Sequence, residues 1–274
     1  MKKLKSFATI VLLTYIFSGC LQISTKINVQ KDGSGTINEK VLMSKTFINM
    51  MKEFAQAFQD STSTEEFSFF KDDEIIADAK DYGDEVKYVS HNFVKDDNWE
   101  GYEVIYSFDD ITKIKIDPDP DSKVGMGDGV ESACESTDYY FFKFNKGDVA
   151  ELIIDRPPIE LNNESEESSD QNPQDSSEQN EDEMGKEFLK MMEGMKVDIS
   201  IEVDGNISKT NASYVDGSTV TLFQMDLSEM MKNEEAFKEF KNREPKNIGE
   251  MKKFLEKFPG MKIEVEKPVS VKFN

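Results

Sequence analysis

The chain is poor in the residues that build most catalytic and metal sites. Its 274 residues include two cysteines, Cys20 and Cys134, one histidine, His91, and one tryptophan, Trp99. Two cysteines make no disulfide framework, and one histidine excludes sites that need several imidazole ligands. A glycine-rich phosphate loop and the G-x-S-x-G turn of serine hydrolases are also missing. We therefore expect neither an enzyme nor a bound cofactor.

Basic residues are also scarce. The sequence has 33 Lys and Arg against 55 Asp and Glu, a formal net charge of −22. Such a charge disfavours nucleic acids and anionic membrane surfaces as electrostatic partners. Because acidic pairs occur throughout, none of them marks a glycosidase-like dyad. The 20 Phe, 14 Met and 8 Tyr nevertheless supply enough apolar bulk for a packed core.

The longest early apolar run is short. Residues 7–17 read FATIVLLTYIF and follow Lys2, Lys3 and Lys5. About 20 apolar residues are needed to cross a bilayer as a helix, so this run is too short for a permanent span. A basic segment followed by such a run is typical of a secretory signal, which is removed. We expect residues 1–19 to be this signal peptide.

The residues after this run resemble the lipobox of bacterial lipoproteins. Ser18 and Gly19 directly precede Cys20, and Phe17 stands where that family prefers Leu. The resemblance implies that the Cys20 thiol receives a diacylglycerol and becomes the new N-terminus. Two or more acyl chains anchor a protein stably, so the expected partner is the membrane, through lipid on Cys20. The alternative is an uncleaved apolar N-terminus with an incidental cysteine.

A lipid anchor on Cys20 implies that the protein is located outside the cytoplasm. Leu21 is not the Asp that retains such lipoproteins in the inner membrane, and no acidic run for surface export follows Cys20. The outer membrane, facing the periplasm, is therefore favoured. In a host with one membrane, the outer face of the cell membrane is expected. Only two or three residues separate Cys20 from the first expected strand, a slack of about 10 Å, so the folded part should lie against the membrane.

Alternation of apolar and polar residues predicts a largely β structure. Residues 22–30 and 36–44 alternate around a KDGSG turn, and residues 210–226 alternate around Asp216-Gly217. Both patterns are typical of β-hairpins. Further strands are expected at 86–94, 102–108, 111–116, 149–154 and 196–203, with 138–144 apolar on both faces and a closing strand pair from Gly260.

Helices are expected between these hairpins. Ser44 offers an N-cap for residues 45–58, where Phe47, Met51, Phe54 and Phe58 form one apolar stripe. Further helices are expected at 188–195, ended by Gly194, and after a cap at Asp226 or Ser228. A last helix carries a second apolar set, made of Met251, Phe254, Leu255 and Phe258. The predicted class is α+β, an antiparallel sheet of hairpins packed by amphipathic helices.

An acidic insertion interrupts this pattern. Residues 160–183 contain no Lys, Arg or aromatic residue, so like charges repel and little can be buried. We interpret it as a disordered linker, with a cation-attracting or partner-binding segment as the alternative. The expected organisation is residues 1–19 as signal peptide, 20–159 and 184–274 as two parts of one α+β envelope domain, and 160–183 between them.

The best metal candidate is an acidic stretch after the strand at 111–116. Asp117, Asp119, Asp121 and Asp128 occupy positions 1, 3, 5 and 12 of a calcium-loop count. Position 6 is Ser122 instead of glycine, and position 12 is Asp instead of a bidentate Glu. We treat these four residues as a weak candidate and expect no metal.

Three single residues leave alternatives open. His91 lies in an expected strand, where a surface or edge role is the alternative to a base or ligand. Trp99 lies at an expected hairpin tip, where it packs against a neighbouring edge or dips into the lipid interface. For Cys134, a buried inert thiol is the alternative to a redox role.

The hairpins resemble one known family. A V-x-x-DGSG hairpin shortly after a lipidated cysteine, with a later hairpin carrying G-x-T-V-T, is similar to the extracytoplasmic domain of LppM-like bacterial lipoproteins. The matching positions are Gly33, Gly35, Gly205, Asn211, Gly217 and 219–221, while Leu222-Phe223 replaces the family's usual Trp. The resemblance implies an α+β envelope domain in which both parts share one sheet. It brings no catalytic residues.

Two functions remain at this point. The first is a non-catalytic structural or interaction module held close to the membrane, whose partner is an envelope protein and whose core is solid. The alternative is a binder or carrier of lipid-like amphiphiles, which requires an apolar cavity of several hundred Å³.

Overall fold

The first hairpin forms as its alternating pattern predicts. In the computed structural model, which describes residues 20–58, 69–119, 139–159, 194–232, 247–258 and 260–274, β1 (Leu21–Val29) pairs antiparallel with β2 (Gly35–Ser44). Alternate residues of both strands are buried. Glycine is required at position 35, because a Cβ there would lie 1.9 Å from the carbonyl oxygen of Asn28.

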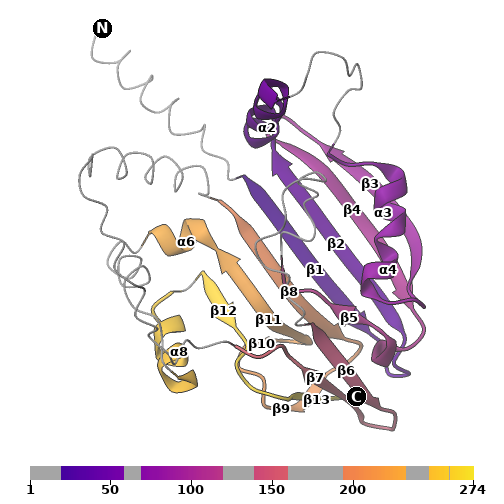
Figure 1. Ribbon diagram of the computed structural model, residues 1–274. Coiled ribbons are helices and arrows are strands. Elements are labelled where there is room, and N and C mark those ends of the chain that lie inside the picture. Colours follow the sequence, from indigo (N-terminus) through magenta and orange to yellow (C-terminus); the bar gives the residue numbers. More distant parts are fainter. Residues whose placement is uncertain (1–19, 59–68, 120–138, 160–193, 233–246, 259) are drawn as a thin grey trace, which may run out of the picture.

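The hairpin lies inside an eight-stranded sheet that joins distant parts of the chain (Figure 1). Its order is β10-β11-β8-β1-β2-β4-β3, with β12 also paired to β11. The hairpin patterns did not predict that β8 pairs with β1 in parallel. The strands are β3 (Lys87–Lys95), β4 (Trp99–Phe108), β8 (Lys196–Val203), β10 (Val215–Asp216), β11 (Thr219–Asp226) and β12 (Met261–Ile263).

A second sheet of five strands has the order β5-β6-β7-β13-β9. Strands from both sides of residues 160–183 therefore pair within each sheet. The sheet consists of β5 (Lys115–Ile116), β6 (Tyr140–Asn145), β7 (Ala150–Asp155), β9 (Ile207–Thr210) and β13 (Val269–Phe273).

Three sequence-based expectations were wrong in detail. The strand expected at 111–116 begins as a 3-10 turn, Ile111–Lys113, because the Asp110 side chain accepts a hydrogen bond from the Thr112 N–H. The strand expected to be apolar on both faces has one exposed face, where Phe141 is 52% exposed. The two strands after Gly260 do not pair with each other, since β12 joins β11 and β13 joins β7 and β9.

The helices are short and lie around the sheets, so the fold is α+β (Figure 1). Expected caps are present: the Ser44 hydroxyl accepts from the Phe47 N–H at 3.2 Å, and the Asp226 carboxylate accepts from the Glu229 N–H. Residues 188–193 and the acidic insertion lie outside the described residues. The helices are α2 (Lys45–Phe58), α3 (Asp72–Ala77), α4 (Ala79–Tyr82), α6 (Leu227–Met231) and α8 (Ile248–Leu255).

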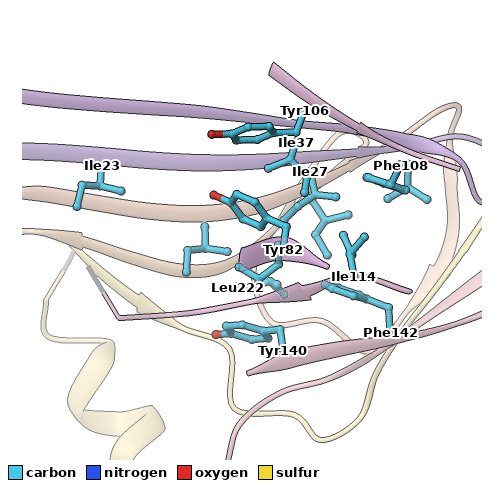
Figure 2. Close-up of a cluster of buried hydrophobic side chains, with 14 of the residues drawn as sticks. Ile23, Ile27, Ile37, Tyr82, Tyr106, Phe108, Ile114, Tyr140, Phe142 and Leu222 are labelled. Carbon is cyan, nitrogen blue, oxygen red and sulfur yellow. The ribbon is translucent and has the colours of Figure 1, made fainter. Parts of the chain in front are cut away.

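The main core lies between the two sheets. Figure 2 shows Ile23, Ile27 and Ile37 of the eight-stranded sheet on one side and Tyr140 and Phe142 of β6 on the other. The ring of Tyr82 enters from α4 and lies 5.4 Å from the ring of Tyr106, centroid to centroid. The second sheet and α4 thus cover much of the face that the sequence assigned to amphipathic helices.

One acidic side chain is buried in this core. Glu39 of β2 is 2% exposed and accepts hydrogen bonds from the hydroxyls of Tyr82 and Tyr102, the latter at 3.2 Å. The hydroxyl of Tyr106 donates to the carbonyl oxygen of Ile75 in α3 at 2.7 Å. Buried polar groups are costly unless they are hydrogen-bonded, so these contacts fix where α3 and α4 lie on the sheet.

Replacing Glu39 by Ala should lower the free energy of unfolding by about 2–4 kcal/mol, because two buried hydroxyls lose their acceptor. Urea unfolding of Glu39→Ala, Tyr82→Phe and the double variant measures the coupling between the two side chains. The double variant should lose less free energy of unfolding than the two single variants together. Glu103→Ala on the opposite face of the sheet is the matched control, expected within about 0.5 kcal/mol of the wild type. An effect of Glu39→Ala as small as that of the control would contradict this account.

The fold should also lose stability in alkali. Burial, followed by the charge of Glu39, raises the pKa of Tyr82 well above its ordinary value, and burial raises that of Tyr102 as well. The folded state therefore favours the neutral phenols. The stability that these neutral phenols contribute to the fold is constant below the ordinary tyrosine pKa of about 10 and is lost as the pH rises above it.

Urea unfolding at about pH 8 and about pH 11 checks this effect, since Tyr82→Phe should reduce the loss between the two conditions. An ultraviolet titration of the phenolates should show Tyr82 and Tyr102 ionising only on unfolding. The prediction fails if Tyr82 and Tyr102 titrate together with the exposed tyrosines in the folded protein.

Candidate functional site

Cys20 lies at one end of the eight-stranded sheet, directly before β1. Its carbonyl oxygen accepts a hydrogen bond from the Ser44 N–H at 2.9 Å, so its backbone already belongs to the sheet. Ser44 is paired with Trp99 at the start of β4. On the other side, Lys196 begins β8 and is paired with Asp226 at the end of β11. We call Asp226, Lys196, Cys20, Ser44 and Trp99 the anchor edge.

Local turns and caps hold the neighbouring segments at this edge. The Lys45 N–H donates to the carbonyl oxygen of Asn98 at 2.9 Å, which joins the start of α2 to the β3–β4 turn. In that turn, Asp96 Oδ1 accepts from the N–H groups of Asn98 and Trp99, both at 2.8 Å. Figure 1 shows α2 beyond the end of β2 and beside the start of β1. The edge is therefore a connected rim.

Opposite charges meet at the other end of the edge. Lys196 Nζ lies 2.7 Å from Asp226 Oδ2. Partial burial opposes ionisation of Asp226, but hydrogen bonds from Lys196, Ser228 and the Glu229 N–H outweigh it and lower the pKa of Asp226. The carboxylate thus stays charged, caps α6 and holds it at the start of β8.

The side chain of Cys20 is part of the core, with 5% of its surface exposed. Burial raises the pKa of its thiol. Because the thiolate is the reactive form, Cys20 is a poor nucleophile in the folded chain. The lipobox-like motif marks this residue as a candidate for acylation but gives no sign of its burial. Cys134 lies outside the described residues.

The single histidine has two polar partners that the sequence did not indicate. His91 Nε2 lies 2.8 Å from Asp72 Oδ1, and His91 Nδ1 lies 2.8 Å from the hydroxyl of Tyr88. Among the described strands, β3 is the last in the order of the eight-stranded sheet, so His91 lies at a sheet edge. A β-bulge between Tyr88 and Ser90 lets Tyr88 and His91 share a face, and the sequence shows no sign of that bulge. The contacts attach α3 to β3.

A second buried polar group joins the sheets near the C-terminus, and the sequence did not single it out. Arg156 is 7% exposed and donates to the carbonyl oxygens of Val265 and Pro157, both at 2.7 Å. Glu264 is 1% exposed and accepts from the Ser213 N–H at 2.5 Å. These contacts position the segment between β12 and β13, a structural role.

The calcium-loop candidate is described only in part. The Asp119 N–H donates to Asp117 Oδ1 at 2.9 Å, so this carboxylate already stabilises its own turn. Asp121 and Asp128 lie outside the described residues. Within the part of the chain that the structure describes, no three Asp, Glu, His or Cys side chains are grouped to hold a metal ion.

Comparison with known proteins does not identify a family for this chain. No family model matches the chain, and no curated protein matches it. Among solved structures, the NMR structure of the folded domain of Mycobacterium tuberculosis LppM aligns with a TM-score of 0.32 and 9% sequence identity, covering 94% of this chain and 92% of that one. Of the helices in the described ranges, none has the length and apolar character to span a bilayer.

The Cys20 thiol of unmodified, folded chain should react slowly with iodoacetamide at neutral pH, because it is buried and its pKa is raised. Cys134→Ser isolates the Cys20 signal. Mass spectrometry over time should show at least tenfold faster alkylation in urea than in buffer. Equal rates in the two conditions would mean that Cys20 is accessible in the folded protein.

Proposed function

We propose that this protein is a lipoprotein of the cell envelope, anchored through acyl chains on Cys20, whose folded part is a non-catalytic interaction module close to the membrane. The observation that carries the proposal is the position of Cys20. The residue that the lipobox-like motif marks for acylation is also the residue where the chain enters the sheet, bonded through its carbonyl oxygen to Ser44.

The burial of Cys20 sets the order of events. A thiol that is 5% exposed and has a raised pKa is a poor substrate for acylation in the folded state. We therefore expect acyl transfer before β1 joins β2 and β8, with the acylated side chain turned out of the core toward the bilayer. This order fits a chain that leaves the cytoplasm unfolded and folds after modification.

The interior supports an interaction module over an amphiphile carrier. Ile27 and Ile37 of the eight-stranded sheet and Leu152 and Ile154 of the second sheet have 0% exposure and belong to one core cluster. Figure 2 shows aromatic rings between these sheets as well. A carrier would need an apolar cavity of several hundred Å³, whereas in this part of the described interior the side chains have no exposed surface that could line one.

The function of such a module is to present its surface at a fixed distance from the bilayer. Leu21, which is not Asp, favours the outer membrane facing the periplasm in a host with two membranes. The hydrogen-bonded position of His91, held by Asp72 and Tyr88, fits a structural role for that residue. An envelope protein is the expected partner.

Cells that express the chain should incorporate labelled palmitate, and Cys20→Ser should abolish the label. Cys134→Ser is the matched control and should keep it. Mass spectrometry of the N-terminal peptide should give a mature chain that begins at an acylated Cys20. An unmodified Cys20 or a retained leader would refute the proposal.

A further inference from the structure

The rim around Cys20 combines apolar side chains with nearly balanced charge. α2 buries Ile48 (3% exposed) and leaves Met50 40% exposed. Phe47 and Met51 are half-buried on the same helix, and Trp99 is half-buried at the start of β4. Trp99 lies two strands from Cys20, roughly 10 Å at the usual strand spacing. Indole rings favour the interface between lipid and water.

The charge of this rim differs from that of the whole chain. The net charge of −22 would repel an anionic bilayer from most of the molecule. At the rim, Lys95 Nζ lies 3.0 Å from Glu100 Oε2, and Lys196 Nζ lies 2.7 Å from Asp226 Oδ2. The charged residues of α2 up to position 53 and of the β3–β4 turn are Lys45, Lys52 and Lys95 against Glu53, Asp96, Asp97 and Glu100.

We propose that α2 and Trp99 form a surface that rests in the lipid interface and fixes how the domain stands on the membrane. This inference depends on acylation of Cys20, as proposed above. Backbone hydrogen bonds connect Cys20 to Ser44 and Lys45 to Asn98, so the anchored residue and this surface form one unit. With no spacer between lipid and sheet, the acyl chains bring Met50 and Trp99 to the bilayer. The apolar side chains, and not anionic lipid, provide the contact.

Trp99 is the only tryptophan, so it reports on this contact without a label. Natively acylated protein is reconstituted in phosphatidylcholine vesicles with or without a lipid that carries a nitroxide near its headgroup. Trp99 fluorescence should be blue-shifted and quenched at least twofold relative to unacylated Cys20→Ser protein of residues 20–274 mixed with the same vesicles. Replacing one quarter of the lipid by phosphatidylglycerol should leave the quenching unchanged.

A moved tryptophan is the matched control. Phe141 is 52% exposed on β6, which lies away from the anchor edge in Figure 1. Acylated Trp99→Phe/Phe141→Trp protein should show no lipid-dependent quenching. Met50→Glu should reduce quenching of Trp99 while the protein still floats with the vesicles, because the acyl chains hold it there.

The outcomes separate the two proposals. Mass spectrometry of each preparation first establishes whether Cys20 is acylated, and its absence overturns both the anchor and the surface. Acylated protein whose Trp99 is unquenched, or quenched no more than the tryptophan at position 141, overturns the surface alone. Quenching that appears only with phosphatidylglycerol also overturns it, since the contact would then be electrostatic.

Discussion

The fold depends on the two-sided pairing of β1. This strand pairs antiparallel with β2, its neighbour in sequence, and in parallel with β8, which begins at Lys196. The first pairing is local, but the second closes a loop of more than 160 residues and must be compensated by buried apolar contacts. Ile23, Ile27 and Val29 supply them on the core face, together with the facing residues of β8. Because the pairing extends to the first residues of β1, it also fixes the position of Cys20.

Apolar burial alone would not determine which segment covers the sheet, since the hydrophobic effect has no direction. Three polar contacts make that choice for α3 and α4. The Glu39 carboxylate accepts a hydrogen bond from the Tyr82 hydroxyl of α4, and the Ile75 carbonyl of α3 accepts one from the Tyr106 hydroxyl. The Asp72 carboxylate of α3 contacts the His91 ring. Each contact joins a short helix to a different strand, β2, β4 or β3. Helices of six and four residues are not stable alone, so these contacts and the core beneath them hold the helices in place.

The local features could be read from the sequence, and the long-range ones could not. Period-2 alternation and Asp-Gly turns located the hairpins, and Ser44 and Asp226 cap helices as expected. Alternation shows which face of a strand is buried but not which strand lies beside it, so the β1–β8 pair and the place of β13 between β7 and β9 were missed. One available signal was overlooked. Glu39 alternates with Ile37 and Val41, so the pattern itself places a carboxyl group on the buried face. At the candidate site, the motif marks Cys20 only as a candidate for acylation, whereas its burial follows from tertiary packing.

The strongly acidic composition and the site of anchoring have linked consequences. On a chain acylated at Cys20, the absence of a spacer keeps the anchor edge in contact with the lipid while the rest of the molecule extends away from it. Electrostatic repulsion from anionic lipid is screened beyond about 8 Å at physiological ionic strength, so only charges close to the surface are strongly affected. The charges of α2 up to position 53 and of the β3–β4 turn nearly cancel, with three basic against four acidic residues. Contact through this surface therefore adds little electrostatic repulsion, and the short tether directs the same surface, α2 and Trp99, toward the bilayer.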